Sequence, residues 1–245
     1  MAEFLDTAQG RRLAYHRTPG RGPGIIFCGG FMSDMTGTKA IWLEDWARQQ
    51  GRAFLRFDYS GHGESSGAFE EGCIGDWAED AMAALTALTE GPQVLVGSSM
   101  GGWIALLLAR RAPERVKGLV GIAAAPDFTE DSMWPDLSAA QQREVQEQGQ
   151  TAMISAYDDR PFVLTRRLFE DGRAQLVLRD PLPLPFPVRL VQGTKDEAVA
   201  TDVPLRLLAH AESPDMRLTL VKGADHRFSA PECLELIGQA IGEVS

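Results

Sequence analysis

Gly97-Ser98-Ser99-Met100-Gly101 is the stretch of sequence that decides the fold. An apolar run typical of a strand comes directly before it, and a stretch with the apolar spacing of a helix comes directly after it. A serine at the tip of such a tight strand-to-helix turn needs small neighbours two residues away, and the two glycines supply them. Only Ser99 is central between these glycines. The pentapeptide alone arises by chance in a glycine-rich chain, but in this setting it predicts that Ser99 is a nucleophile.

Strands and helices alternate along most of the chain around this turn. Short apolar runs predict strands over 13–15, 25–28, 53–57, 94–98, 119–123, 188–192 and 218–221. Apolar residues at three- and four-residue spacing predict helices over 40–50, 75–89, 100–112, 203–211 and 231–242. Such alternation is typical of an α/β fold, a mainly parallel central sheet with helices on both faces. We predict that all 245 residues form one domain of this class.

Residues 126–187 break this rhythm. Polar helix formers, scattered aromatic residues and prolines replace the regular strands and helices there. At about sixty residues, the stretch is longer than an ordinary connection, and long connections are usually functional. It starts after the strand that ends near Ala123 and rejoins the sheet at the proline-rich 181–187. We predict a small helical lid inserted at about 127–186.

Charge and hydropathy exclude several classes of partner. The chain has 34 acidic residues against 24 lysines and arginines, for a formal net charge of −10. Because no basic stripe is present, we expect no nucleic-acid partner. No apolar run is long enough to cross a bilayer, so we expect no stable membrane insertion. Residues 1–15 also lack the basic and apolar segments of a secretory signal.

The cysteines indicate the compartment. Cys28, Cys73 and Cys233 are odd in number, widely scattered and without metal-ligand spacing. We therefore expect reduced core thiols in a cytoplasmic protein. Residues 58–65 resemble a phosphate-binding loop, but they lack the glycine spacing and the lysine of a nucleotide site and indicate a structural turn. We expect neither a metal ion nor an organic cofactor.

A nucleophilic serine that attacks a carbonyl needs two N–H donors where negative charge develops. The amide of Met100 follows the nucleophile at the start of a helix and is the first candidate. Gly29 and Gly30 follow an earlier apolar strand and allow the backbone to turn so that the Phe31 amide faces Ser99. We predict that Phe31 and Met100 form an oxyanion hole, although an ordinary tight turn also explains the two glycines.

The general base is found by elimination among four histidines. His226 alone follows the last predicted strand, where a loop brings imidazole to Ser99. Asp196 follows the strand before it and is our candidate for the carboxylate that orients His226. Glu197 and Asp225 compete for that role, and a turn or helix cap is the alternative use of Asp196.

Apolar residues near the elbow and in the insertion are candidates for an acyl pocket. We expect most residues of this set to belong to the core. The four that we predict to line the pocket are Met32, Trp103, Trp134 and Met153. Tyr157 lies in the same stretch. Four arginines put positive charge in the insertion, where they either meet an anionic substrate group or form a solvated helix face: Arg160, Arg166, Arg167 and Arg173.

These residues together resemble a known family, the mitochondrial palmitoyl-protein thioesterases of the abhydrolase group, also described as acyl-glucuronide esterases. The resemblance covers the whole chain, and it is carried by 23–27, 37–40, 56–61, 91–103 with its VGSSMGGW core, Lys195-Asp196 and Asp225-His226-Arg227. The family's elbow serine, loop aspartate and DHR histidine correspond to Ser99, Asp196 and His226. The resemblance implies an α/β-hydrolase fold and a Ser-His-Asp triad.

The resemblance also implies a reaction. The expected substrates are small-molecule acyl esters or thioesters and S-acylated protein cysteines. The mitochondrial matrix, for a mature form, is the alternative to the cytoplasm, and the chain shows no Arg-rich, Ser-rich presequence. Lactone or carbon–carbon bond hydrolysis by the same triad is the second hypothesis. A ligand-binding protein without turnover is the third hypothesis. Such a protein usually lacks a triad member, and this sequence has all three.

Overall fold

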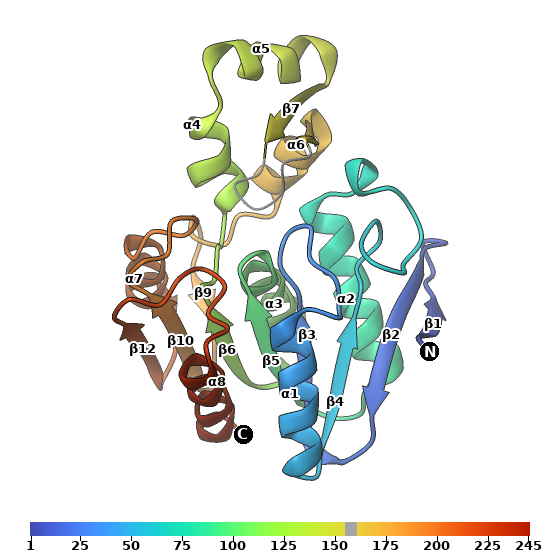
Figure 1. Ribbon diagram of the computed structural model, residues 1–245, viewed down its shortest axis with the longest axis vertical. Helices are drawn as coiled ribbons and strands as arrows, with labels where there is room; N and C mark the ends of the chain where they lie inside the picture. The colour runs from blue at the N-terminus through green and yellow to red at the C-terminus, as the bar shows by residue number, and fades with distance from the viewer. Residues whose placement is uncertain (155–160) are drawn as a thin grey trace.

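The computed structural model describes residues 1–154 and 161–245, which form one eight-stranded sheet with helices on both faces (Figure 1). Across the sheet the strands follow the order β1-β2-β4-β3-β5-β6-β10-β12. Their bounds are β1 Glu3–Asp6, β2 Arg12–Thr18, β3 Arg21–Cys28, β4 Arg52–Phe57, β5 Gln93–Ser98, β6 Val116–Ile122, β10 Val188–Gly193 and β12 Met216–Val221. The pairs β1–β2 and β2–β4 are antiparallel, and the remaining pairs are parallel.

The central strands are apolar because both faces of the sheet are covered. Every residue of β5 and of β10 is buried. Parallel strands that lie between two helical layers read as continuous apolar runs, which is why the sequence reveals them. Each predicted strand is present, with ends that differ by a few residues. The exposed edge strand β1 was not predicted, because it has no such run.

The helices form one layer on each face. Helices α1 (Thr38–Gln49) and α8 (Pro231–Glu243) pack with Val191 on one face, whereas α2 (Ile74–Leu88), α3 (Met100–Arg111) and α7 (Asp202–His210) pack with Leu190 on the other. Alternation along β10 explains this division, since successive side chains of a strand point to opposite faces. The mainly parallel sheet and its two helical layers are confirmed. No helix within the described ranges has both the length and the apolar character needed to span a bilayer.

The insertion lies between β6 and β10, above the end of the sheet at which the parallel strands finish (Figure 1). It contains a π-helical turn Thr129–Met133, α4 Trp134–Asp136, α5 Ala139–Gln148, β7 Gln150–Ile154, β8 Pro161–Thr165 and α6 Arg166–Ala174. Strand β9 (Leu182–Pro183) then pairs with β11 (Ala211–Glu212). Besides its helices, the insertion contains one antiparallel strand pair, β7 with β8, that was not predicted from the sequence.

Asp127 holds the two ends of the insertion together. Its side chain is fully buried, and its carboxylate accepts hydrogen bonds from the amides of Val177 (2.8 Å) and Leu178 (3.0 Å) and from Arg179 (3.2 Å). Burial raises the pKa of Asp127, and these hydrogen bonds oppose that rise. The start and the return of the insertion are therefore fixed at one point beside the sheet.

A buried ion pair fixes α1 against the sheet, and α1 begins just after the loop that carries Phe31. Glu44 of α1 accepts hydrogen bonds from Thr18 (2.6 Å) and from Arg56 (2.7 Å), and all three side chains are nearly inaccessible. Burial raises the pKa of Glu44, but the Thr18 and Arg56 hydrogen bonds outweigh it, so that the pKa is lowered. The ionised pair therefore stabilises the fold.

Glu44→Gln is expected to lower the free energy of unfolding at pH 7 by about 2–3 kcal/mol, because it leaves the Arg56 guanidinium buried without a counter-charge. The contribution of Glu44 is present above its unfolded pKa and is lost as the pH falls through its lower folded pKa. Urea unfolding should therefore show a large difference in the free energy of unfolding between the variant and the wild type at pH 7, and a much smaller difference at pH 3. The control Asp45→Asn removes an exposed ion pair with Arg48 and should change stability by under about 1 kcal/mol.

Candidate active site

Ser99 lies at the turn between β5 and α3 and has the strained backbone of a nucleophile elbow. Its torsions are φ 55° and ψ −122°, which are uncommon for a residue with a side chain. Its amide donates to the carbonyl of Ile122 at 2.9 Å, and its own carbonyl accepts from the amides of Gly102 and Ala125. The backbone of the neighbouring strand β6 thus holds the strained turn in place.

The glycines of the elbow are required by close packing. A Cβ at Gly97 would overlap the carbonyl oxygen of Gly101, and a Cβ at Gly101 would overlap the carbonyl oxygen of Cys28. The turn after β5 therefore lies directly against the end of β3. This contact brings Ser99 and the Gly29-Gly30 loop together.

The loop after β3, which carries Phe31, lies against Ser99. A Cβ at Gly30 would lie 3.5 Å from the Cβ of Ser99, so this position allows close approach. The Phe31 ring is anchored in an aromatic cluster, with ring centroids 4.9 Å from Phe69 and 5.7 Å from Phe128. Among the described residues, neither the Phe31 amide nor the Met100 amide donates a hydrogen bond. The prediction that these two amides form an oxyanion hole therefore stays a prediction.

His226 and Asp196 meet across two loops. Nδ1 of His226 lies 2.9 Å from Oδ2 of Asp196, whose side chain is fully buried, while that of His226 is 18% exposed. Burial raises the pKa of Asp196, but the hydrogen bonds from His226 and from the Val199 amide outweigh burial and lower it. Asp196 is therefore ionised, and it favours the tautomer of His226 that carries its proton on Nδ1.

Hydrogen bonds between the two loops fix this pair. The Thr194 amide donates to the Val221 carbonyl at 3.0 Å, and the Lys195 amide donates to the Ala224 carbonyl at 2.9 Å. A Cβ at Gly193 would overlap that same Ala224 carbonyl, so the loops approach as closely as backbones can. The competitor Asp225 uses its carboxylate differently, because Oδ1 accepts from the Phe228 amide at 3.1 Å.

Ser99 and His226 line one cavity of about 620 Å³ under the insertion. Its walls come from the elbow, the loop after β3, the loop after β10 and the insertion. The apolar residues that line it are Phe31, Met32, Ala125, Phe128, Met133, Met153, Phe162, Ala198 and Val199. These apolar walls beside a few polar groups are typical of a site for an acyl chain. Among the described residues, no three histidine, cysteine, aspartate or glutamate side chains gather closely enough to hold a metal ion.

Charged side chains of both signs also line this cavity. Lys39 and Arg227 lie on the side of the histidine loop, and Asp136 comes from the insertion. The ammonium group of Lys39 donates a hydrogen bond to the carbonyl of Arg227. Burial lowers the pKa of Lys39 to about 8, and the carboxylate of Asp225 opposes that fall. Lys39 therefore ties the start of α1 to the loop that carries His226.

Two of the four predicted pocket residues line this cavity, Met32 and Met153, and two do not. Trp103 is fully buried on α3, and its indole N–H donates to the Gln175 carbonyl at 3.1 Å. It packs beneath the insertion because its helix runs away from Ser99.

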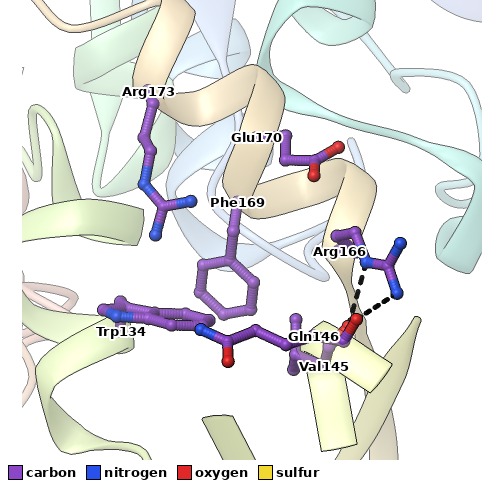
Figure 2. A pocket seen from close by; sticks show the side chains of 7 residues that line it. All are labelled: Trp134, Val145, Gln146, Arg166, Phe169, Glu170 and Arg173. Carbon is purple, nitrogen blue, oxygen red and sulfur yellow. Dashed lines mark hydrogen bonds between the residues drawn. The ribbon is translucent and has the colours of Figure 1, made fainter. Parts of the chain in front are cut away.

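Trp134 lines a separate hollow of about 230 Å³ between α4, α5 and α6. Figure 2 shows Trp134 beside Phe169, with Arg166 and Arg173 on either side. Arg173 lies over the Trp134 ring and pairs with Glu130, whereas Arg166 bonds to the end of α5. Arg167 pairs with Asp76. The insertion arginines therefore hold the fold together, and Tyr157 and Arg160 lie outside the described residues.

Sequence reasoning missed several residues at this site. Phe128, Lys39 and Asp136 line the cavity, but each lies far from the elbow along the chain. Gln192 also escaped notice, although it bonds directly to Asp196 at 2.9 Å. The signal that could have identified Gln192 is its place as a polar residue near the end of a fully buried strand.

Comparisons with known proteins agree with this architecture. The family model described as the alpha/beta hydrolase fold matches residues 23–169. The chain is 37% identical to the "Palmitoyl-protein thioesterase ABHD10, mitochondrial" of Rattus norvegicus, a match that covers 96% of this chain and 79% of that protein. The human protein of the same name is 35% identical, and that match covers 98% of this chain and 79% of the relative.

Solved structures give the same result. A putative hydrolase from Agrobacterium vitis S4 superposes with a TM-score of 0.93 at 39% identity, covering 100% of this chain and 97% of the other. Alpha/beta hydrolase domain-containing protein 10 from mouse superposes with a TM-score of 0.91 at 36% identity, covering 100% and 98%. The predicted fold class and family resemblance are confirmed.

Proposed function

The chain belongs to the α/β-hydrolase family, and we propose that it is a serine hydrolase that cleaves acyl esters or thioesters through an acyl-enzyme. One arrangement carries this proposal, a strained serine and a histidine held by a buried carboxylate that share one apolar cavity. The amides of Phe31 and Met100, which donate no hydrogen bond among the described residues, support the same chemistry. Since the fold hosts many reactions, these groups rather than the fold support the assignment.

Each residue has a defined role in the proposed reaction. His226 takes the proton of Ser99 as the serine oxygen attacks the substrate carbonyl. The amides of Phe31 and Met100 donate to the oxyanion as it forms, and Asp196 stabilises the imidazolium. His226 then gives its proton to the leaving alcohol or thiol. Water, activated by His226, hydrolyses the acyl-Ser99 ester and releases the carboxylic acid.

The relatives support the substrate class. The rat and human proteins are named palmitoyl-protein thioesterases, which points to acyl thioesters for this chain. The apolar wall beside Ser99 suits an acyl chain, because each buried methylene contributes about 0.8 kcal/mol. Both S-acylated proteins and small acyl esters are therefore proposed substrates. The relatives are named mitochondrial, so a matrix location stands beside the cytoplasmic one as a proposal.

A matched panel tests this function. Ester and thioester substrates with the same acyl chains, from two to sixteen carbons, would be turned over by the purified protein, with simple lactones and β-diketones as the competing classes. We expect turnover of the esters or thioesters to exceed that of lactones and diketones. Lactone or carbon–carbon bond hydrolysis as the fastest reaction would favour the second hypothesis, and no turnover of any class would favour a binding protein.

Met153→Trp is expected to shorten the preferred acyl chain, because Met153 lines the cavity from β7. Excluding two methylenes costs about 1.6 kcal/mol, which lowers kcat/KM for long chains about fifteenfold and leaves two-carbon substrates nearly unchanged. Trp134→Phe is the matched control, because Trp134 faces the separate hollow. An equal loss in both variants, or no loss in Met153→Trp, would contradict this placement of the acyl chain.

A further inference from the structure

Asp196 receives four hydrogen bonds, and one comes from a residue with no assigned role. Oδ1 accepts from the amides of Ala198 (2.9 Å) and Val199 (2.8 Å). Oδ2 accepts from His226 and, also at 2.9 Å, from Nε2 of Gln192. A carboxylate has about four acceptor positions, so the environment of Asp196 is complete. Gln192 and His226 share one oxygen atom.

The orientation of the Gln192 amide follows from its partners. Besides Oδ2 of Asp196, Nε2 lies 3.0 Å from the Val199 carbonyl and 3.4 Å from the Gly193 carbonyl. All three partners are oxygen acceptors, so the NH2 group and not the carbonyl must face them. The side chain is fully buried, and its Oε1 has no hydrogen-bond partner among the described residues. Burying Oε1 without a hydrogen-bond partner costs free energy, so the presence of Gln192 at this position points to a specific role.

The position of Gln192 links the acid to the sheet. It lies at the end of β10, four residues before Asp196, and its two strong hydrogen bonds reach both Asp196 and Val199. One side chain thus ties the start and the end of the turn that presents the carboxylate. Rotation of Asp196 away from His226 would break the bond to Gln192 as well as that to the imidazole.

We propose that Gln192 is a positioning residue for the reaction, holding Asp196 in the orientation that accepts the hydrogen bond from Nδ1 of His226. This inference rests on the proposed function, since it assigns Gln192 an effect on the same catalytic residues. Gln192 is not among the described residues that line the cavity, and it bonds to Asp196 rather than to Ser99 or His226. Its donated hydrogen bond also lowers the pKa of Asp196, together with those of His226 and Val199.

Gln192→Met tests the proposal by removing the donor while keeping the length of the side chain. We expect kcat to fall about ten- to a hundredfold with KM nearly unchanged, the size of effect that follows loss of one hydrogen bond to a charged group. Without the donor the carboxylate becomes more basic, so the acidic limb of the kcat profile should move to higher pH. The charged groups near Asp196 and His226 are the same in the wild type and in Gln192→Met. They are Lys39, Lys195, Glu197, Asp225 and Arg227.

Two further variants separate positioning from stability. Val191 precedes Gln192 in β10 and packs on the opposite face of the sheet. Val191→Ala removes part of that packing, so it should lower the melting temperature without moving the pH profile of kcat. Gln192→Glu keeps the size and polarity of the side chain but places a second carboxyl beside Asp196, and it should lower kcat further than Gln192→Met.

The outcomes distinguish this inference from the proposed function. Active wild type with a slow, pH-shifted Gln192→Met variant supports the positioning role. A Gln192→Met variant with kcat within twofold of wild type and the same pH profile would overturn it. So would a Val191→Ala variant that shifts the profile equally, because the effect would then follow stability alone. A folded wild type that hydrolyses no ester or thioester would refute the proposed function instead.

Discussion

Ser99→Ala is expected to lower kcat for ester hydrolysis by about six orders of magnitude, the loss seen when a catalytic serine is removed from a triad. The physical reason is the absence of the oxygen that attacks the carbonyl, so that only the oxyanion donors and the cavity still act on the substrate. The melting temperature should stay near that of the wild type, since Ser99 contributes little to the core. Steady-state turnover of a chromogenic ester would measure the loss.

Ser98→Ala is the control for that variant, because Ser98 is the adjacent serine at the end of β5. It should retain turnover, since Ser98 ends β5 and only Ser99 has the strained backbone of the turn, although both serines line the cavity. A large loss in Ser98→Ala with little change in Ser99→Ala would reverse the assignment of the two serines.

Asp196→Asn is expected to lower kcat by roughly four orders of magnitude while leaving the fold intact. The backbone amides of Ala198 and Val199 hold the Asn carbonyl oxygen in the place of Oδ1, so the Asn NH2 group faces Nδ1 of His226, where the carboxylate accepts a hydrogen bond at 2.9 Å. An NH2 donor at that position favours the tautomer whose Nε2 carries the proton and cannot act as a base. The loss should exceed that of Gln192→Met, because Asp196 contacts the base directly. Turnover measured over a range of pH, with circular dichroism as a check on folding, would test it.

Two neighbouring carboxylates provide the controls for Asp196→Asn. Glu197 is exposed beside it, and Asp225 accepts its hydrogen bond from the Phe228 amide. Glu197→Gln and Asp225→Asn should each keep kcat within about tenfold of the wild type. Unchanged turnover in Asp196→Asn, with a large loss in either control, would reassign the orienting acid.

The fold was predictable because its signals are local. Buried parallel strands such as β5 are continuous apolar runs, and the elbow needs glycines within a few residues of Ser99, so both appear in short stretches of sequence. The insertion was harder. The pairing of β7 with β8 depends on contacts between segments, and the polar helix formers around it favoured helices.

The site was predictable only in part, because contacts between distant segments leave no signal in a short stretch of sequence. Ser99, Asp196 and His226 follow strands, and the ends of parallel strands meet at one edge of the sheet, so chain order was enough to select them. Trp103 was assigned to the pocket from its nearness to Ser99 along the chain, but α3 carries it into the core. Lys39 reaches the histidine loop from a distant helix, a contact that no spacing reveals.

Covalent labelling of the wild-type protein with a fluorophosphonate, followed by peptide mapping, tests the central claim most directly. Such probes phosphonylate an activated serine and spare ordinary ones. The proposed mechanism predicts one adduct, on the Ser99 side chain, that is absent from Ser99→Ala. An adduct on a different residue, or none on folded and accessible wild-type protein, would contradict the assignment of Ser99 as the nucleophile.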